Sequence, residues 1–146
     1  MRLGTIISKR VSLDMEICLN LDFKPVGWKR PAGRNIRYDK QVADKVAFSA
    51  TVLKALHETY PKEMAARGGL PLFGDRPVIV DLLFVFKGKY VDAKNVPDID
   101  NLVKFTLDAL QSEMLSGVVW EDDRQVVDIH AKKLRGEEDK IIVLIR

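Results

Sequence analysis

VIVDLLFVF, residues 78–86, is the longest apolar run of this 146-residue chain, and only Asp81 interrupts it. β-branched and aromatic side chains are abundant in it, and both faces of an extended chain would be hydrophobic. The run therefore predicts a central strand that is covered on both faces. Asp81 is expected to have a buried polar partner, because an unpaired carboxylate is costly to bury.

The residues before this strand predict one further strand and one helix. Hydrophobic and polar residues alternate in LDMEICLNLDF, residues 13–23, which is typical of a strand. Between Asp39 and Pro61, apolar residues recur at helical spacing: Val42, Val46, Ala50, Leu53, Leu56 and Tyr60. Residues 61–77 hold three glycines and two prolines after Pro61 and are expected to form a long loop.

The residues after the central strand predict a second helix and two strands. Pro97 precedes the helix and Gly117 ends it, with Val103, Leu107, Leu110 and Met114 on its apolar stripe. Residues 125–134 and 140–145, joined by the turn RGEED, predict a hairpin. The order β-α-β-α-β-β predicts an α+β fold, with a single mixed β-sheet and two helices packed against it. Residues 1–146 are expected to form one domain, with residues 1–12 as a loose N-terminal extension.

Composition indicates an ordinary soluble globular protein, with 47% hydrophobic and 31% charged residues. No apolar run is long enough to span a bilayer, and the N-terminus does not resemble a signal peptide. Cys18 is the single cysteine, so no intramolecular disulfide can form. These features predict a cytoplasmic protein that does not bind membranes.

Charge is distributed unevenly along a chain whose net charge is only +3. Residues 24–40 hold six lysines and arginines and a single acid, Asp39, whereas residues 98–123 hold seven acids and a single base, Lys104. A basic segment beside an acidic one suits a metal-dependent enzyme that acts on a polyanion. Two solvated faces of opposite charge are the alternative.

The acidic segment contains two pairs of aspartates. Asp98 and Asp100 would face the same side of an extended chain, and Asp122 and Asp123 precede the next strand. If the pairs converge, their oxygen donors would select Mg²⁺ or Mn²⁺, and Lys104 could stabilise charge on a phosphate. Alternatively, Asp98 or Asp100 caps the helix, Asp100 pairs with Lys104, and Asp122 and Asp123 are turn residues.

Two segments, PDIDNLVKFTLDAL (97–110) and GVVWEDDRQVVD (117–128), closely resemble the RusA family of Holliday junction resolvases, the crossover junction endodeoxyribonucleases. The shared pattern is D-x-D-N-x-x-K, then D-A-L, then D-D-x-Q-V-V. The resemblance implies a Mg²⁺-dependent endodeoxyribonuclease (Mn²⁺ may be a substitute) that resolves four-way junctions by phosphodiester hydrolysis in paired strands. It also implies that Asp98, Asp100 and Asp123 bind the metal and that Lys104 is the catalytic lysine, with Asp122 of lesser consequence.

The expected partners are branched double-stranded DNA and a second copy of the chain, since the family's resolvases act as dimers. Leu70, Leu72 and Phe73 are the expected interface residues. The residues expected to contact DNA are Lys29, Arg30, Arg34, Lys87, Lys89 and Lys94, with Lys133 either near the site or flanking the sheet. The alternative function is a non-catalytic protein that binds branched DNA on the same fold.

Three aromatic residues are also candidates for a role in binding. Trp28 and Tyr90 lie among lysines and arginines and are candidates to stack on bases. Trp120 is expected to anchor its turn in the core instead.

Overall fold

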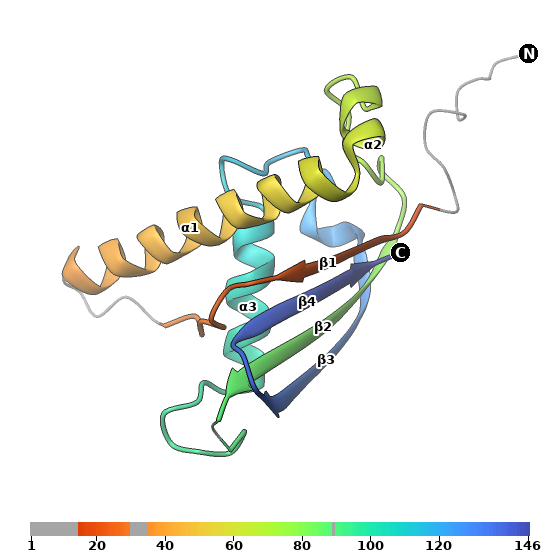
Figure 1. Ribbon diagram of the computed structural model, residues 1–146. Helices are drawn as coiled ribbons and strands as arrows, with labels where there is room; N and C mark the ends of the chain where they lie inside the picture. Colours follow the sequence, from red (N-terminus) through yellow and green to blue (C-terminus); the bar gives the residue numbers. More distant parts are fainter. Residues whose placement is uncertain (1–14, 30–34, 89) are drawn as a thin grey trace, which may run out of the picture.

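The computed structural model describes residues 15–29, 35–88 and 90–146. Along the chain, these residues form β1 (Ile17–Leu21), α1 (Asn35–Thr59), α2 (Pro61–Ala66), β2 (Val78–Lys87), α3 (Ile99–Leu110), the short 3₁₀ helix η2 (Asp123–Gln125), β3 (Val126–Gly136) and β4 (Lys140–Ile145). The strands form one sheet in the order β1-β4-β2-β3, with β2 antiparallel to β4 and parallel to β3. The predicted α+β fold with a single mixed sheet is confirmed (Figure 1).

β2 is an internal strand, as its apolar sequence predicted. The side chains on one of its faces are at most 3% exposed: Val78, Val80, Leu82, Phe84 and Phe86. On the other face Ile79, Asp81 and Leu83 are half-buried, so complete covering of both faces was wrong for this part of the strand. Asp81 does have a partner there, because its Oδ2 lies 2.9 Å from the Arg146 guanidinium.

The predicted hairpin of the last two strands is wrong, because β3 and β4 lie on opposite sides of β2. Residues 137–139 join them across the end of β2, where the Lys87 N–H donates to Asp139 Oδ1 at 2.8 Å. This order gives the apolar β2 a partner along each edge. The more polar and exposed β3 takes the outer position, which suits an edge strand.

The core lies between one face of the sheet and the helices. α1 contacts β1, and α3 contacts both α1 and β3; in Figure 1, α3 lies behind the strands. Phe48 of α1 is fully buried, and its ring lies 5.1 Å from that of Phe23 and 6.0 Å from that of Phe105 on α3. The two helices therefore pack on one another as well as on the sheet.

The predicted apolar stripe of α1 is correct only in part. Leu56 is buried as expected, but Val42 and Val46 are 40% and 52% exposed. Phe48 and Val52 line the buried face instead. In Figure 1, the first half of α1 extends beyond the sheet, so the strands do not cover that part of the helix.

The expected long loop 61–77 contains the helix α2. Pro61 is its first residue, where the missing N–H removes no helical hydrogen bond. After α2, Leu72 and Phe73 are 7% and 0% exposed, and the Leu72 N–H donates to the Val118 carbonyl at 2.8 Å. These two side chains belong to the core of the chain and are not available as the predicted dimer interface.

The second predicted helix is shorter than expected. α3 ends at Leu110, and Gly117 stands in a later turn with φ of 71°.

In the parts of the chain that the structure describes, no helix is long and apolar enough to cross a membrane.

Candidate functional site

α3 carries a line of charged side chains on its outer side. Asp100, Lys104 and Asp108 are four residues apart, so they follow one another along one side of the helix. Lys104 Nζ lies 3.9 Å from Asp108 Oδ2, and Lys45 Nζ of α1 lies 3.7 Å from the same oxygen. Asp108 was not among the predicted site residues, although its spacing from Asp100 and Lys104 was a usable signal.

The segment between β1 and α1 supports Lys104. The Lys104 ammonium lies 4.8 Å from the centre of the Trp28 ring. The backbone N–H of Trp28 donates to the backbone carbonyl of Asn101 at 2.8 Å. A cation over an aromatic face is stabilised electrostatically. Trp28, a candidate for base stacking, thus contacts the lysine with its ring and restricts where that lysine can reach.

Asp98 and Asp100 lie at the N-terminus of α3 and are exposed. Asp98 occupies the N-cap position, but its side chain makes no capping hydrogen bond. Asp100 Oδ1 accepts the Asn101 N–H at 3.0 Å. Lys133 Nζ donates to the Pro97 carbonyl at 3.1 Å, so β3 holds the backbone that leads into the helix. Because the Asp98 carboxylate makes no capping hydrogen bond, it is available for a ligand.

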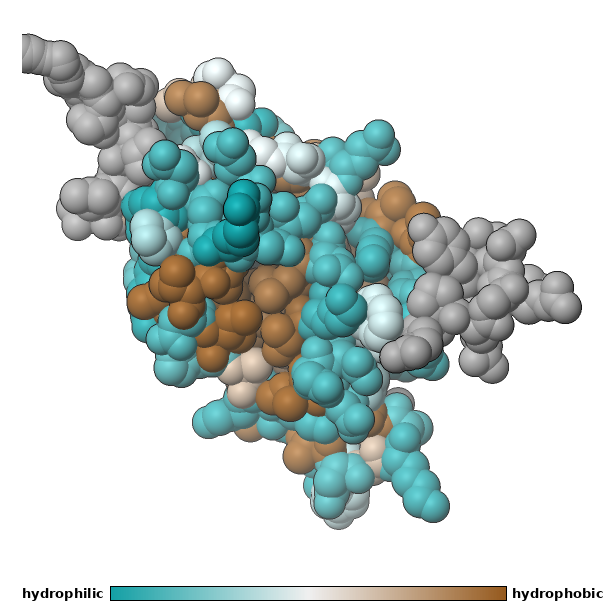
Figure 2. Space-filling view, turned by 180° about the vertical axis from the view of Figure 1, so that it is seen from behind, coloured by the Kyte–Doolittle hydropathy of each residue, from teal (hydrophilic) through white to brown (hydrophobic). Residues whose placement is uncertain are grey.

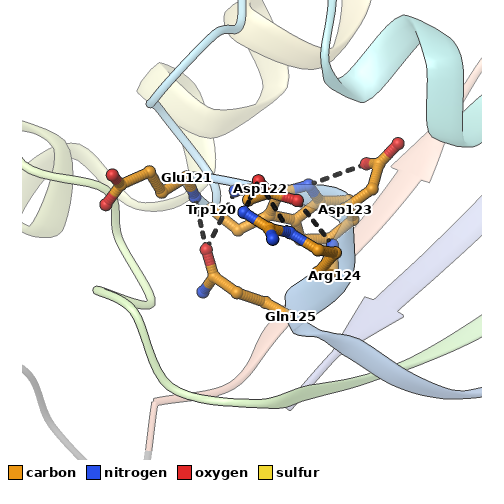
Figure 3. A network of polar contacts seen from close by, with 6 residues as sticks. All are labelled: Trp120, Glu121, Asp122, Asp123, Arg124 and Gln125. Carbon is orange, nitrogen blue, oxygen red and sulfur yellow. Dashed lines mark hydrogen bonds and ion pairs between the residues drawn. The ribbon is translucent and has the colours of Figure 1, made fainter.

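Asp123 is presented by a tightly bonded turn (Figure 3). Asp122 and Gln125 form a capping box around η2, in which Gln125 Oε1 accepts the Asp122 N–H at 3.0 Å. Gln125 Oε1 also accepts the Glu121 N–H at 2.7 Å. Trp120 is fully buried, as expected, and its Nε1–H donates to Asp123 Oδ1 at 3.3 Å. In Figure 3 the Asp123 carboxylate points away from Gln125, toward the side on which α3 lies.

Asp122 and Asp123 have opposite electrostatic environments. Hydrogen bonds from the Arg124 side chain and backbone hold the pKa of Asp122 below its usual value. The pKa of Asp123 is raised, mainly by burial and further by repulsion from Asp108 and Asp122, against the hydrogen bond from Trp120 and the attraction of Lys104.

The predicted metal ligands come from two elements. Asp98 and Asp100 stand at the start of α3, and Asp123 is the first residue of η2. Among the residues that the structure describes, no group of three or more His, Cys, Asp or Glu side chains is arranged to hold a metal ion. The roles of Asp98, Asp100, Asp123 and Lys104 in catalysis stay predictions.

The donor chemistry nevertheless fits a hard divalent cation. The carboxylates are exposed oxygen donors, the type that Mg²⁺ and Mn²⁺ prefer. Burial and, to a smaller extent, repulsion from Asp108 and Asp122 raise the pKa of Asp123, and a nearby cation would offset that repulsion.

The predicted DNA contacts are only partly within the described residues. Lys29, Lys87 and Lys94 are exposed, and the Lys29 backbone is held at both its N–H and its carbonyl by the Gln41 side chain. Lys133 is bonded to the Pro97 carbonyl. Arg30, Arg34 and Lys89 lie outside the described residues.

Asp123→Asn is expected to stabilise the metal-free protein at neutral pH. A carboxyl group with a raised folded pKa contributes favourably below its unfolded pKa, and this contribution is lost as the pH rises through the folded pKa. Asparagine cannot ionise and keeps an acceptor for the Trp120 N–H. The variant's Tm should match that of the parent below about pH 4 and exceed it increasingly at higher pH.

Asp122→Asn supplies a control of opposite sign. The pKa of Asp122 is lowered, so its contribution is present above the unfolded pKa and is lost as the pH falls through the folded pKa. This variant should melt below the parent at neutral pH and converge with it in acid. Thermal melts from pH 3 to 8 measure this. If the Tm of both variants moved in the same direction from that of the parent at neutral pH, the opposite pKa shifts of Asp122 and Asp123 would be contradicted.

Comparison with known proteins relates the chain to a protein family and to a bacterial protein. Residues 22–146 match the model of a protein family described as Endodeoxyribonuclease RusA. A stretch of 50 residues is 42% identical to the uncharacterized protein YqaN of Bacillus subtilis (strain 168), and it covers 34% of this chain and 32% of that protein. The chain therefore aligns with about a third of the length of this curated relative.

Proposed function

The chain belongs to the RusA family of endodeoxyribonucleases, and we propose from this premise that it is a metal-dependent, structure-selective nuclease that resolves four-way DNA junctions. The reaction would be phosphodiester hydrolysis in paired strands. The observation that carries this proposal is the family match over residues 22–146, which includes the D-x-D-N-x-x-K and D-D segments. An intact set of these residues favours an enzyme over a protein that only binds branched DNA.

The proposed roles follow from the position and chemistry of each side chain. Asp98, Asp100 and Asp123 would hold Mg²⁺ or Mn²⁺, which when bound polarises a phosphodiester and promotes the ionisation of water. Lys104 would offset negative charge that develops on the phosphate. Its side chain is 50% exposed, so it can reach a ligand while Trp28 restricts its direction.

The substrate would be held by exposed lysines of the β1–α1 and β2–α3 parts of the chain. Lys29 precedes α1, Lys87 is the last residue of β2, and Lys94 lies in the segment between β2 and α3. Such side chains neutralise phosphates without reading base sequence. We also assign Arg30, Arg34 and Lys89 to this role on sequence grounds alone.

The direct test uses a labelled synthetic four-way junction, with a linear duplex of the same sequence as the control substrate. In Mg²⁺ or Mn²⁺ the protein should make paired cuts in opposing strands of the junction, and EDTA should abolish them. The duplex should remain uncut. Tight junction binding without any cutting in either metal would favour the alternative, a branched-DNA-binding protein.

Divalent metal is expected to raise the Tm of the protein. An ion that binds only the folded state stabilises it by mass action, by about 3 kcal/mol at a hundredfold excess over the dissociation constant. The triple variant Asp98→Asn, Asp100→Asn, Asp123→Asn should not respond to Mg²⁺ or Mn²⁺. A matched triple variant at exposed aspartates elsewhere, Asp75→Asn, Asp92→Asn, Asp128→Asn, should respond like the parent. Equal responses of the two triple variants would place the ion at another site.

We further propose that the active form is a homodimer, since resolution of a junction requires two matched cuts. Seen from behind, the molecule has a hydrophobic patch bordered by hydrophilic side chains (Figure 2). On β3, Val127 and Ile129 are 63% and 39% exposed. Ile129 is on the same face of β3 as Lys133, which contacts the start of α3, where Ile99 is 37% exposed. We propose this surface of β3 and α3 as the dimer contact.

A further inference from the structure

Tyr90 presents an accessible aromatic ring in the segment that joins β2 to α3. The residue is 67% exposed, and the Arg135 guanidinium lies 4.7 Å from the centre of its ring. The guanidinium covers one face of the ring. Because two thirds of the residue is still accessible, the other face is open to a flat ligand.

The backbone around Tyr90 is held by hydrogen bonds. The Tyr90 carbonyl accepts the Ala93 N–H, and the Ala93 carbonyl accepts the Val96 N–H, each at 3.0 Å. Val96 is 6% exposed and anchors the end of the segment in the core. At the other end, the Gly88 N–H donates to the Gly136 carbonyl at 3.0 Å. A ring on such a preorganised segment loses little conformational freedom when a ligand stacks on it.

The Tyr90–Arg135 pair lies close to the start of α3. Arg135 and Lys133 are two residues apart on β3, so they share one face and are about 7 Å apart along the strand. Lys133 Nζ lies 3.1 Å from the carbonyl of Pro97, the residue before Asp98. Lys133 thus connects the strand that carries Arg135 to the residue before Asp98, one of the carboxylates to which we assign metal binding.

Charged side chains of both signs surround the pair. The lysines Lys87 and Lys94 are exposed nearby. The neighbouring acids are Asp92, Glu137, Glu138 and Asp139. Asp139 already accepts the Lys87 N–H, and Glu138 lies 4.0 Å from Lys140. Glu138 is thus paired with a cation, and the guanidinium of Arg135 and the two lysines supply positive charge for phosphates.

We propose that Tyr90 and Arg135 form a stacking platform for a nucleobase at the branch point of the DNA. Base stacking is interrupted where strands exchange, so a base there can move onto the open ring face at a lower cost than a base inside a duplex. Aromatic platforms accept any base, since every base has a π-face. The platform rests on the proposed function for its natural substrate, and it would select branched over linear DNA.

The test is a thermodynamic cycle on the intact protein, measured as binding in EDTA. Wild type and Tyr90→Ala are each titrated with a four-way junction and with the same junction carrying abasic residues at the branch point, which keep every phosphate. For the wild type, removal of the bases should weaken binding by about five- to a hundredfold. Tyr90→Ala should bind both junctions equally, at the wild type's weaker affinity. Tyr90→Phe should behave as the wild type, and Arg135→Lys should lose part of the discrimination.

Two controls separate this inference from the proposed function and from folding. A short single strand and its abasic counterpart test the platform without any junction, and the wild type should prefer the strand with bases. Thermal melts check that Tyr90→Ala is folded. Retained base discrimination by folded Tyr90→Ala, on either ligand, would overturn the platform. If the wild type bound four-way junctions no more tightly than linear duplexes but still preferred the single strand with bases to its abasic counterpart, the proposed function alone would be overturned.

Discussion

Asp98→Asn and Asp123→Asn are each expected to lower junction cleavage by about a hundredfold or more while preserving junction binding. Asparagine keeps the shape of each side chain but removes a charge that would hold the metal. The loss of negative charge beside the DNA phosphates also reduces repulsion, so binding should stay equal or become tighter. Cleavage under single-turnover conditions at saturating Mg²⁺, together with binding in EDTA, measures the two quantities separately.

Asp122→Asn is the matched control for this prediction. Asp122 is adjacent to Asp123 in the chain, but its carboxylate is occupied by the backbone and side chain of Arg124. The variant should cleave at close to the parent rate at a temperature where it is folded. Near-parent cleavage by Asp123→Asn, or an equal loss in Asp122→Asn, would contradict the assigned site.

Local sequence predicted the strands well because each strand's composition reflects its own burial. The apolar run 78–86 could only be stable inside a sheet, and β2 is internal. The pairing of β3 and β4 could not be predicted in the same way. A short connection favours a hairpin, but the pairing of a strand depends on the free energy of all the possible strand pairs in the sheet. Here β3 and β4 each pair with one edge of the apolar β2, and that preference is a property of the whole sheet.

The candidate site, too, could be predicted from the sequence only in part. The apolar stripe with Val103, Leu107 and Leu110 identified the helix that carries Asp100 and Lys104. Contacts between distant segments were not visible, such as the Trp28 ring beneath Lys104 and the shared position of Asp108 between two lysines. These contacts arise where the β1–α1 segment and α1 pack on α3, and one-dimensional spacing carries no information about that packing.

Ile129→Asp is expected to convert the proposed dimer to a monomer, whereas Leu134→Asp is not. The two residues are on the same strand and are 39% and 40% exposed, but they lie on opposite faces of the sheet. Ile129 stands beside the buried Val80 on the face that the helices cover, and Leu134 stands beside Val85 on the other face. The pair therefore provides the same substitution at equal exposure, with and without the proposed contact.

The physical reason for a large effect is the two-fold symmetry of such an interface. Each substitution introduces two carboxylates, one from each copy, into a surface that must lose water on association. An unpaired charge buried in this way should raise the dissociation constant by at least about a hundredfold. Sedimentation equilibrium should give the wild type and Leu134→Asp about twice the 16.6 kDa of one chain, and Ile129→Asp the mass of one.

Monomeric Ile129→Asp should also nick junctions in one strand more often than it makes paired cuts, because one domain with one acidic site supplies one cut. A wild-type protein that is monomeric at micromolar concentration and still makes paired, near-simultaneous cuts would refute the dimer, and a dimeric Ile129→Asp would place the interface elsewhere.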